Sequence, residues 1–369
     1  MIALSTPSSV LLAGGGSAGH VSPLLSLADA LRRRHPDVRL TALGTREGLE
    51  ARLVPDRGID LRFVPKVPLP RRPSGDLLRL PGNLRAAVAA AGAAIDETSA
   101  QVVVGFGGYV STPAYLAARR RGVPIVVHEQ NARAGIANRL GARWSSHVAT
   151  TFSGTALSHA RRIGMPLRRE VATLDRAALR AEAAEALGLD PSRTTVLVTG
   201  GSLGAQRLNE AFRARAALLG DAGIQVLHVT GLGKEFDPDA SVTGARYVVV
   251  PYADRIELAY AAADLVVARA GANTVCELTA VGLPAVYVPL PVGNGEQRLN
   301  AADVVAAGGG LLVEDADFTP DWIDAHLLDL VTDSERLGDM ARRARGLGEP
   351  RADELLADMV DDAAQGSAS

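Results

Sequence analysis

Two glycine-rich segments of the chain contain the residue types that bind oxygen-rich ligands. The first is "VLLAGGGSAGH", Val10 to His20, and the second is "VLVTGGSLGAQRLN", Val196 to Asn209. Glycines let backbone N–H groups approach a ligand closely, and the N-terminus of the helix that follows favours negative charge. Each segment therefore predicts either an anion-binding loop or, without a ligand, a tight turn between a strand and a helix.

The spacing Gly14-x-Gly16-x-x-Gly19 is also that of a dinucleotide-binding turn. In that fold an acidic residue at the end of the second strand binds the adenosine ribose. Here the second apolar run, in "VRLTALG", is followed by Thr45 and Arg46, and Glu47 lies past the turn. The expected carboxylate is missing, which argues against an NAD-dependent dehydrogenase.

Polar side chains follow several apolar runs in the first half. His20 opens the first helix, Tyr109 follows a glycine turn in "VVVGFGGYVSTP", and "VVHEQNARAG" places His128, Glu129 and Asn131 in one short loop. Loops at a sheet edge are where ligand contacts concentrate. Histidine accepts a proton near neutral pH, so His20 is a candidate general base. The alternatives are a capping or packing role for His20 and packing over the turn for Tyr109.

The second half contains two further polar patterns. In "ARAGANTVCELTAVGLP", Thr274 and Glu277 have the spacing of a helix capping box, but a carboxylate at Glu277 could equally accept hydrogen bonds from a ribose diol. In "LPVGNGEQRLN", Gln297 and Asn300 lie one helical turn apart. Amides suit sugar hydroxyls, although such amides are often only surface residues.

The elements that must position these residues are short apolar runs separated by helical patterns. The runs lie at 10–13, 39–43, 61–64, 102–106, 125–127, 147–150, 195–198, 225–230, 247–250, 265–268, 285–288 and 311–313. This alternation indicates parallel sheets with helices on both faces. We therefore expect an α/β fold with two Rossmann-like doubly wound domains that face each other across a cleft. Ligands of such folds bind at the carboxyl ends of the strands.

The boundary between the two domains is expected in "RRIGMPLRREV", Arg161 to Val171, where Gly164 and Pro166 interrupt both periodicities. We expect residues 1–164 to form the N-terminal domain, on the acceptor and membrane side, and residues 165–344 the C-terminal domain. A C-terminal helix over about 345–363 is expected to pack back on the first domain.

Composition narrows the class of protein. Of 369 residues, 39 are basic and 41 are acidic, so no overall charge favours nucleic acid as a partner. The only cysteine, Cys276, excludes intramolecular disulfides and cysteine-based metal clusters, and it fits a reducing cytoplasm. No stretch approaches the ~20 apolar residues of a membrane span, and the first apolar run is expected to be a strand, not a signal peptide.

One segment has the composition of a membrane-surface contact. "KVPLPRRPSGDLLRLPGNLRAAV", Lys66 to Val88, combines leucines, basic residues and prolines. The prolines disfavour a regular buried strand, so we expect exposed leucines beside basic side chains, centred on Leu77, Leu78 and Arg79. Such a patch suits anionic lipid headgroups. The alternative is an ordinary solvated loop that leads into a core helix.

Six motifs resemble, in order and spacing, those of the MurG family: "GGGSAGH", "GFGGYVSTP", "HEQNARAG", "GGSLGAQRLN", "GANTVCE" and "EQRLNA", from about Val10 to Gly308. The resemblance implies a GT-B type, inverting glycosyltransferase that needs neither a metal nor a cofactor. The family transfers N-acetylglucosamine from UDP-N-acetylglucosamine (UDP-GlcNAc) to the muramyl C4 hydroxyl of undecaprenyl-pyrophosphoryl-N-acetylmuramyl-pentapeptide, lipid I, giving lipid II for peptidoglycan. It also implies a peripheral place on the cytoplasmic face of the cell membrane, an anionic membrane surface, and other wall-synthesis and division proteins as partners.

The resemblance assigns residues to the two substrates. Donor contacts of the second domain match Arg168, Ser202, Ala253, Ala272, Asn273, Thr274, Val275, Cys276, Glu277 and Gln297, with Glu277 on the uridine ribose. Donor contacts of the first domain match Ser17, Ala18, Gly19 and Asn131. Polar positions near the acceptor match His20, Tyr109, His128 and Glu129, to which we add the amide of Asn300. Departures from the family occur at Ala18, Met165, Asn273 and Glu296, and the last two bear on sugar selectivity.

The implied reaction needs a base for the acceptor hydroxyl and stabilisation of the leaving UDP. His20 is the first candidate for the base and Glu129 the second. Helix N-termini, Ser202 and Arg168 would stabilise the pyrophosphate. Two other functions stay open: an enzyme like UDP-GlcNAc 2-epimerase, and a non-catalytic scaffold that binds a UDP-sugar. The epimerase needs no acceptor, so incubation with UDP-GlcNAc alone separates it from the transferase. The scaffold would bind UDP without turnover.

Overall fold

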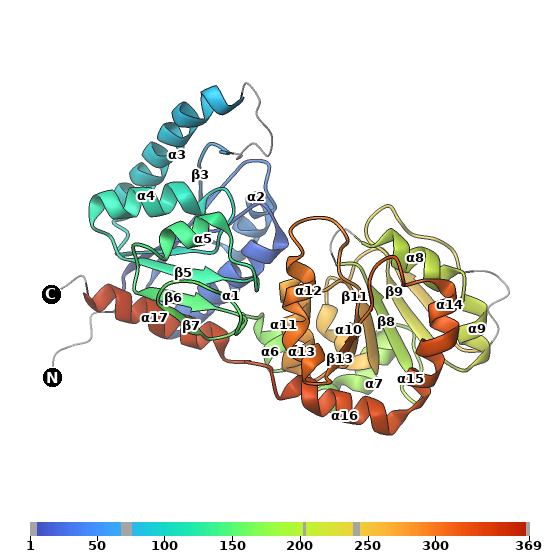
Figure 1. The fold of residues 1–369 in the computed structure, drawn as a ribbon. Coiled ribbons are helices and arrows are strands. Elements are labelled where there is room, and N and C mark those ends of the chain that lie inside the picture. The colour runs from blue at the N-terminus through green and yellow to red at the C-terminus, as the bar shows by residue number, and fades with distance from the viewer. Residues whose placement is uncertain (1–5, 68–75, 202–203, 239–243, 367–369) are drawn as a thin grey trace. The chain divides into compact units, whose positions relative to one another are not determined.

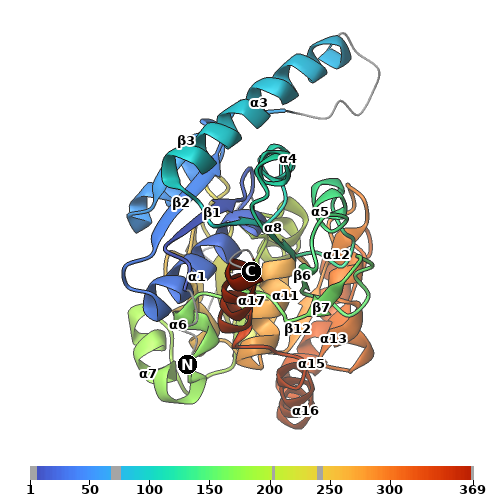
Figure 2. The ribbon, with the colours of Figure 1, turned by 90° about the vertical axis from the view of Figure 1, so that its left-hand side faces the viewer.

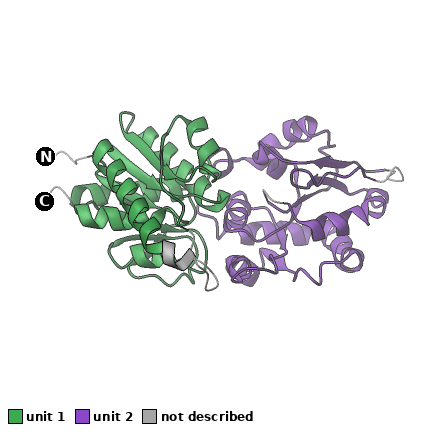
Figure 3. Cartoon of the chain, turned by 90° about the horizontal axis from the view of Figure 1, so that it is seen from above, with its two compact units in different colours: residues 1–168, 351–369 green, residues 169–350 purple. Residues whose placement is uncertain are grey.

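Two parallel β-sheets form the frame of the protein (Figure 1). The computed structural model describes residues 6–67, 76–201, 204–238 and 244–366, without the side chains of residues 76–79. The chain divides into two units, each built on one sheet (Figure 3). The first unit comprises residues 1–168 and 351–369, and the second comprises residues 169–350. The boundary thus falls after Arg168, where the sequence analysis places it after Gly164.

The sheet of the first unit has the strand order β3-β2-β1-β4-β5-β6-β7, and all its strands are parallel. Its strands are β1 (Ser9–Ala13), β2 (Arg39–Gly44), β3 (Asp60–Phe63), β4 (Val102–Gly105), β5 (Ile125–Glu129), β6 (His147–Thr150) and β7 (Ala160–Arg162). All five residues of β1 are buried because helices cover both faces of the sheet. Val10 and Leu12 face one helical layer, and Leu11 and Ala13 face the other.

The helices of the first unit form those two layers. They are α1 (Ala18–Arg34), α2 (Glu50–Leu53), η1 (Pro55–Arg57), α3 (Asp76–Thr98), α4 (Ser111–Arg121), α5 (Ile136–Gly141) and α17 (Ala352–Gly366). Helices α1 and α17 pack on one face of the sheet, and α3 and α4 pack on the other. Figure 2 shows that α3 extends well beyond the sheet.

The C-terminal helix α17 lies against α1, although the two are far apart in the sequence (Figures 1 and 2). Leu356 and Val360 are buried in the same apolar core as α1. Ion pairs join the helices at their edge, among them Arg33 Nη2 with Asp353 Oδ2 at 2.6 Å and Arg34 Nη1 with Asp361 Oδ2 at 2.9 Å. The last described helix therefore completes the core of the first unit.

The sheet of the second unit has the order β10-β9-β8-β11-β12-β13, again all parallel. Its strands are β8 (Thr195–Thr199), β9 (Gln225–Val229), β10 (Tyr247–Val250), β11 (Leu265–Ala268), β12 (Ala285–Tyr287) and β13 (Gly310–Leu312). Its helices are α6 (Arg169–Ala172), α7 (Arg176–Ala186), α8 (Gln206–Arg213), α9 (Ala216–Asp221), α10 (Ile256–Ala262), α11 (Ala272–Val281), α12 (Glu296–Asn300), α13 (Ala302–Ala306), α14 (Pro320–Trp322), η2 (Ile323–Leu327), α15 (Leu328–Thr332) and α16 (Ser334–Arg345).

The predicted fold class, two Rossmann-like doubly wound domains, is confirmed. Each expected strand is present with small differences in its bounds, and β7 is an addition that overlaps the start of the segment expected to link the domains. That the two domains face each other across a cleft stays a prediction. Within the described ranges, no helix is both long and apolar enough to cross a membrane.

Candidate active site

The candidate residues of the first unit lie at the carboxyl edge of its sheet. Strands β1, β4 and β5 are parallel neighbours, so the loops that follow them meet at one edge. The loop after β1 carries Ser17 and leads into α1, whose first residues are Ala18, Gly19 and His20. The loops after β4 and β5 carry Tyr109 and Asn131. The topology therefore brings these predicted residues to one edge.

His20 has a defined ring orientation. Its Nδ1 lies 3.1 Å from the Gly15 carbonyl oxygen and 3.1 Å from Ser17 Oγ. A carbonyl oxygen only accepts hydrogen bonds, so Nδ1 carries the proton that it donates to Gly15. In the neutral ring the lone pair is then on Nε2. The half-buried His20 is therefore arranged to accept a proton at Nε2.

The glycine turn after β4 packs directly against His20. Gly107 and Gly108 have φ of +90° and +77°, a region that favours glycine. A Cβ at Gly107 would lie 3.2 Å from His20 Nε2, and one at Gly108 would lie 2.5 Å from the Gly15 carbonyl oxygen. Ser111 Oγ fastens the turn, because it accepts a 2.9 Å hydrogen bond from the Gly107 N–H. The absence of side chains here makes room for the histidine.

Tyr109, the residue after this turn, is 44% exposed at the same edge. The Lys66 ammonium lies 5.5 Å from the centre of its ring, within cation–π distance. An added Cβ on Gly16 would be 3.9 Å from the ring. Tyr109 thus stands beside the first glycine loop with an open face, where it could contact a ligand.

His128 and Glu129 are the last residues of strand β5, not part of a loop as the sequence analysis expects. His128 is fully buried. Its Nε2–H donates to the Gly164 carbonyl at 2.9 Å, and its Nδ1 accepts from Gln130 Nε2 at 3.0 Å. Burial lowers the pKa of His128 to about 4, so the ring is neutral at pH 7. With no exposed surface, His128 does not reach an acceptor, which corrects that expectation.

We expect His128 to make the first unit acid-sensitive. In the unfolded chain the His128 ring binds a proton below its ordinary pKa of 6.5. In the folded protein the ring stays neutral down to about pH 4. Stability should therefore be constant above pH 6.5 and fall by about 3 kcal/mol towards pH 4. The free energy of unfolding is measured at each pH by urea unfolding, followed by Trp144 fluorescence in a Trp322→Phe background.

In that assay His128→Gln should reduce the change of unfolding free energy with pH, since glutamine does not titrate. His159→Gln is the matched control because His159 is exposed in the same unit. An unchanged slope in His128→Gln would assign the acid sensitivity to other groups.

Glu129 is buried and its carboxylate organises the loop that follows β5. Oε1 accepts from the Asn131 N–H at 2.9 Å, and Oε2 accepts from the Gly135 N–H at 2.9 Å and from Asn138 Nδ2 at 3.0 Å. Asn138 in turn accepts from the Tyr115 hydroxyl at 2.8 Å. These three donors occupy the carboxylate, so Glu129 is better placed to hold half-buried Asn131 than to accept a proton.

Glu50 is a further residue at this edge of the sheet, and no motif in the sequence points to it. Its fully buried carboxylate accepts hydrogen bonds from the Gly16 N–H at 2.9 Å, the Thr45 N–H at 2.8 Å and Thr45 Oγ1 at 3.0 Å. A negative group therefore occupies the Gly16 N–H, which in a dinucleotide fold would face phosphate. This gives a physical reason why the glycine spacing does not make an NAD site. The glycine at position 48 is a sequence feature consistent with a buried Glu50 side chain. A Cβ at Gly48 would lie 2.1 Å from Glu50 Oε2, so a larger residue there would clash with the carboxylate.

The candidate donor residues of the second unit gather on α11, which follows β11. The helix begins after Gly271, and no side chain caps it. The capping-box alternative for Thr274 and Glu277 is therefore wrong. Ala272 and Val275 are buried and offer a ligand only backbone atoms, whereas Asn273, Thr274, Cys276 and Glu277 are partly exposed. Glu277 Oε2 accepts a 2.7 Å hydrogen bond from the buried Tyr260 hydroxyl, which orients the carboxylate.

Helix α12, which follows β12, carries the two expected amides, and one of them is accessible. Gln297 is partly exposed, and its Oε1 accepts from the Leu290 N–H at 2.9 Å, which holds the loop in place. Asn300 is buried, with Nδ2 placed 3.3 Å from the Ala270 carbonyl. Asn300 therefore does not face a sugar, contrary to expectation. Ala253 and Arg168 are partly exposed, and Ser202 lies outside the described residues.

Arg269 is a second residue that the sequence analysis does not single out. It follows β11, and its Nη1 lies 2.5 Å from Asp315 Oδ1 in a largely buried ion pair. The same nitrogen donates to the Val288 and Pro289 carbonyls, each at 3.1 Å. Arg269 thereby joins the segments that follow β11, β12 and β13, and so supports α11 and the loop between β12 and α12.

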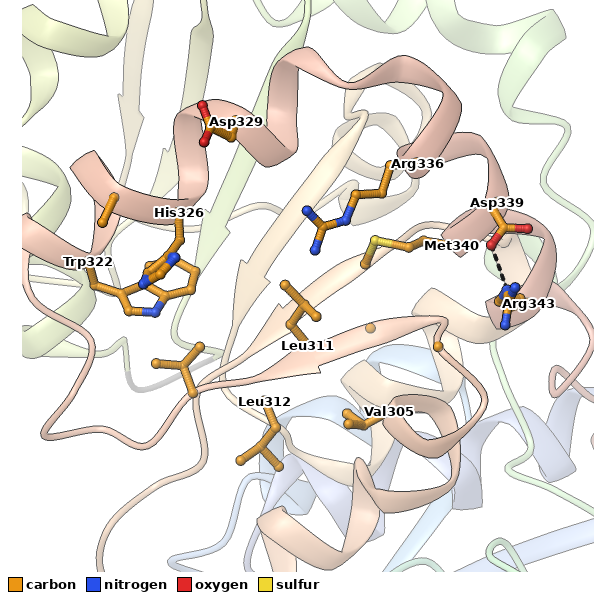
Figure 4. Close-up of a pocket in the computed structure, with 14 residues that line it drawn as sticks. Val305, Leu311, Leu312, Trp322, His326, Asp329, Arg336, Asp339, Met340 and Arg343 are labelled. Carbon is orange, nitrogen blue, oxygen red and sulfur yellow. Dashed lines mark hydrogen bonds and ion pairs between the residues drawn. The ribbon is translucent and has the colours of Figure 1, made fainter.

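A separate pocket of about 640 Å³ lies between β13 and the helices α14 to α16 (Figure 4). Leu311, Trp322, Arg336 and Met340 are among its walls. None of the expected donor residues lines it, so it is distinct from the candidate donor site. Among the residues that the structure describes, no group of three or more His, Cys, Asp or Glu side chains has a metal-binding arrangement.

Comparisons with known proteins agree with this geometry. Residues 10–150 match the glycosyltransferase family 28 N-terminal domain, and residues 195–356 match the C-terminal domain of that family. Proteins of Streptomyces avermitilis and Nocardioides sp. are 56% and 57% identical over 96% and 98% of this chain and 98% and 99% of their own lengths. Both are named "UDP-N-acetylglucosamine–N-acetylmuramyl-(pentapeptide) pyrophosphoryl-undecaprenol N-acetylglucosamine transferase".

The crystal structure of Acinetobacter baumannii MurG superposes with a TM-score of 0.79 at 28% identity, covering 96% of this chain and 100% of that one. These similarities confirm the resemblance seen in the ordered motifs. The chain therefore belongs to glycosyltransferase family 28 and, within it, to the MurG family of N-acetylglucosamine transferases.

Proposed function

We propose that this chain transfers N-acetylglucosamine from UDP-GlcNAc to the muramyl C4 hydroxyl of lipid I and so forms lipid II. The observation that carries the proposal is the identity, over almost the whole length, to relatives named for this transfer. The alternatives of a 2-epimerase-like enzyme and a non-catalytic scaffold are not favoured, because those relatives and both family domains are glycosyltransferases.

The second unit binds the donor in this proposal. Glu277, oriented by Tyr260, accepts from the uridine ribose hydroxyls, and Gln297 and Asn273 contact the sugar. The backbone N–H groups at the start of α11, which has no side-chain cap, face the pyrophosphate. Ser202, together with Arg168 at the end of the first unit, adds donors for the charge that develops as UDP leaves.

His20 is the general base of the proposed reaction. Nε2 takes the proton of the C4 hydroxyl while the oxygen forms a bond to the anomeric carbon. The bond between that carbon and the β-phosphate oxygen breaks, and its electron pair leaves with UDP. Attack opposite to the leaving group inverts the anomeric centre. Glu129, the second candidate, instead holds Asn131 at the site edge.

Transfer of labelled GlcNAc from UDP-GlcNAc to a lipid I analogue, with and without EDTA, tests the proposed function. We expect labelled lipid II in both cases. Formation of UDP-N-acetylmannosamine from UDP-GlcNAc alone would support the epimerase, and binding without turnover would support the scaffold. Loss of activity with EDTA would contradict the metal-independent mechanism.

The lipid-linked acceptor requires the enzyme to reach a bilayer, and we place this contact on the first unit, at the cytoplasmic face of the membrane. Leu77, Leu78 and Arg79 belong to the start of α3, but their side chains lie outside the described residues. On the same face of the sheet, α4 and α5 carry further exposed cations: Arg119, Arg120 and Arg139. Cations that lie near a membrane surface suit anionic headgroups, each contributing about 1 kcal/mol.

We expect the protein to co-sediment with vesicles of phosphatidylglycerol and phosphatidylcholine, less so as salt is raised. Replacing Leu77, Leu78 and Arg79 together by serine should release it without changing UDP binding. Arg336→Ser is the charge-matched control, because Arg336 is an exposed arginine of the second unit. Vesicle binding that is indifferent to both salt and the triple change would place the contact elsewhere.

A further inference from the structure

The buried carboxylate of Glu50 is connected to His20 by a single peptide group. Glu50 Oε2 accepts from the Gly16 N–H at 2.9 Å, and the Gly15 carbonyl accepts from His20 Nδ1 at 3.1 Å. The Gly15 carbonyl and the Gly16 N–H belong to the same peptide unit. Because that unit is planar, an acceptor that fixes the direction of its N–H also fixes the direction of its carbonyl.

From this connection we propose that Glu50 is a positioning residue for His20. It holds the Gly15–Gly16 peptide so that the carbonyl keeps the proton on Nδ1 and the lone pair on Nε2. The negative charge also polarises the peptide, which strengthens the hydrogen bond at the carbonyl end. The inference rests on the proposed role of His20 as the general base.

The surroundings of the peptide leave it little freedom. A Cβ at Gly15 would lie 2.4 Å from Glu50 Oε1, and one at Gly108 would lie 2.5 Å from the Gly15 carbonyl oxygen. The peptide is thus held between the carboxylate on one side and the glycine turn after β4 on the other. Burying a carboxylate is costly unless donors compensate it, and here the loop backbone supplies two of the three donors.

If the role of Glu50 were purely structural, its replacement would have different effects on stability and turnover. The carboxylate also accepts from the N–H and Oγ1 of Thr45, and these bonds hold the loop after β2. If Glu50 served only that loop, its loss would lower stability without acting through His20. The two roles are separated by measurements that report on His20 itself.

The experiment compares Glu50→Gln with Thr45→Val as the matched control. Glutamine keeps the shape but removes the charge, whereas Thr45→Val removes one bond to the carboxylate and leaves the Gly16 bond. We expect Glu50→Gln to lower kcat by about ten- to a hundredfold, the worth of a charged hydrogen bond, with KM for UDP-GlcNAc within about twofold. Thr45→Val should keep kcat within about twofold. An equal loss in both variants would overturn the inference.

Coupling between Glu50 and His20 is measured in the double variant. If Glu50 acts through His20, Glu50→Gln should cause no further loss of kcat in a His20→Ala background. The same loss in both backgrounds would overturn the inference and leave His20 as the base. Full turnover by His20→Ala alone would instead overturn the proposed base, so the two failures are distinguishable.

Nitrogen-15 NMR of the histidine ring gives a readout that does not depend on activity. His20 is assigned by comparison with His20→Ala, since the chain has 7 histidines. We expect the Nδ1–H tautomer in the unaltered protein and a mixture of tautomers in Glu50→Gln. An Nε2–H tautomer in the unaltered protein would overturn the inference even if Glu50→Gln failed to fold.

Discussion

His20→Ala should lower kcat by about two to four orders of magnitude, the usual contribution of a general base. The Gly15 carbonyl holds the ring so that Nε2 has the lone pair, and alanine leaves no group there that takes the C4 proton. The donor is bound by the second unit in the proposed function, so the dissociation constant for UDP-GlcNAc should barely change. Steady-state transfer to a lipid I analogue and calorimetric titration with the donor measure the two quantities.

His159→Ala is the control for this prediction, because His159 is an exposed histidine of the same unit. It should retain full turnover. A His20→Ala variant that keeps most of its kcat would transfer the role to Glu129 or to solvent. A large change in donor affinity would mean that His20 binds the donor as well.

The buried strands can be predicted from sequence because a parallel strand covered on both faces needs apolar residues at nearly every position. Strand β1 is the clear case, with five buried residues in a row. Strand β7 has no such signal, because all three of its residues are exposed at the edge of the sheet. An exposed edge strand is defined by its backbone pairing, which side-chain polarity does not reveal.

The end of β5 is harder to predict for a different reason. Polar residues interrupt the apolar run at His128, so the sequence indicates a loop there. The strand continues because distant partners satisfy these side chains: the Gly164 carbonyl accepts from His128, and Asn138 donates to Glu129. Local patterns do not show partners that lie many residues away, so they cannot separate a buried polar residue from an exposed one.

The same limit explains why Glu50 and Arg269 are missed. Each is an ordinary charged residue by sequence, and each acts on backbone groups from other loops. The edge at which the site lies, by contrast, follows from topology alone, since parallel strands place their following loops together. Sequence reasoning therefore finds the loops that carry a site more readily than the residues that hold those loops in place.

Glu277→Ala is the second change with a large expected effect. Loss of a charged hydrogen-bond partner costs about 1.5–3 kcal/mol, which corresponds to roughly a 10- to 150-fold rise in the dissociation constant for UDP-GlcNAc. Thermal stability should fall little, because no side chain caps α11 and Glu277, which accepts the hydrogen bond from Tyr260, is partly exposed. Calorimetric titration and thermal unfolding measure the two effects.

Two comparisons assign that loss to the ribose. Tyr260→Phe keeps the carboxylate and removes only its orienting hydroxyl, so it should weaken donor binding less than Glu277→Ala does. Titration of both proteins with UDP and 2′-deoxy-UDP completes a double-mutant cycle. Removal of the 2′-hydroxyl should weaken binding to the unaltered protein but make little difference to binding by Glu277→Ala. If the deoxy ligand loses the same affinity for both proteins, the carboxylate of Glu277 does not contact the ribose 2′-hydroxyl, and the proposed ribose contact would be overturned at that hydroxyl.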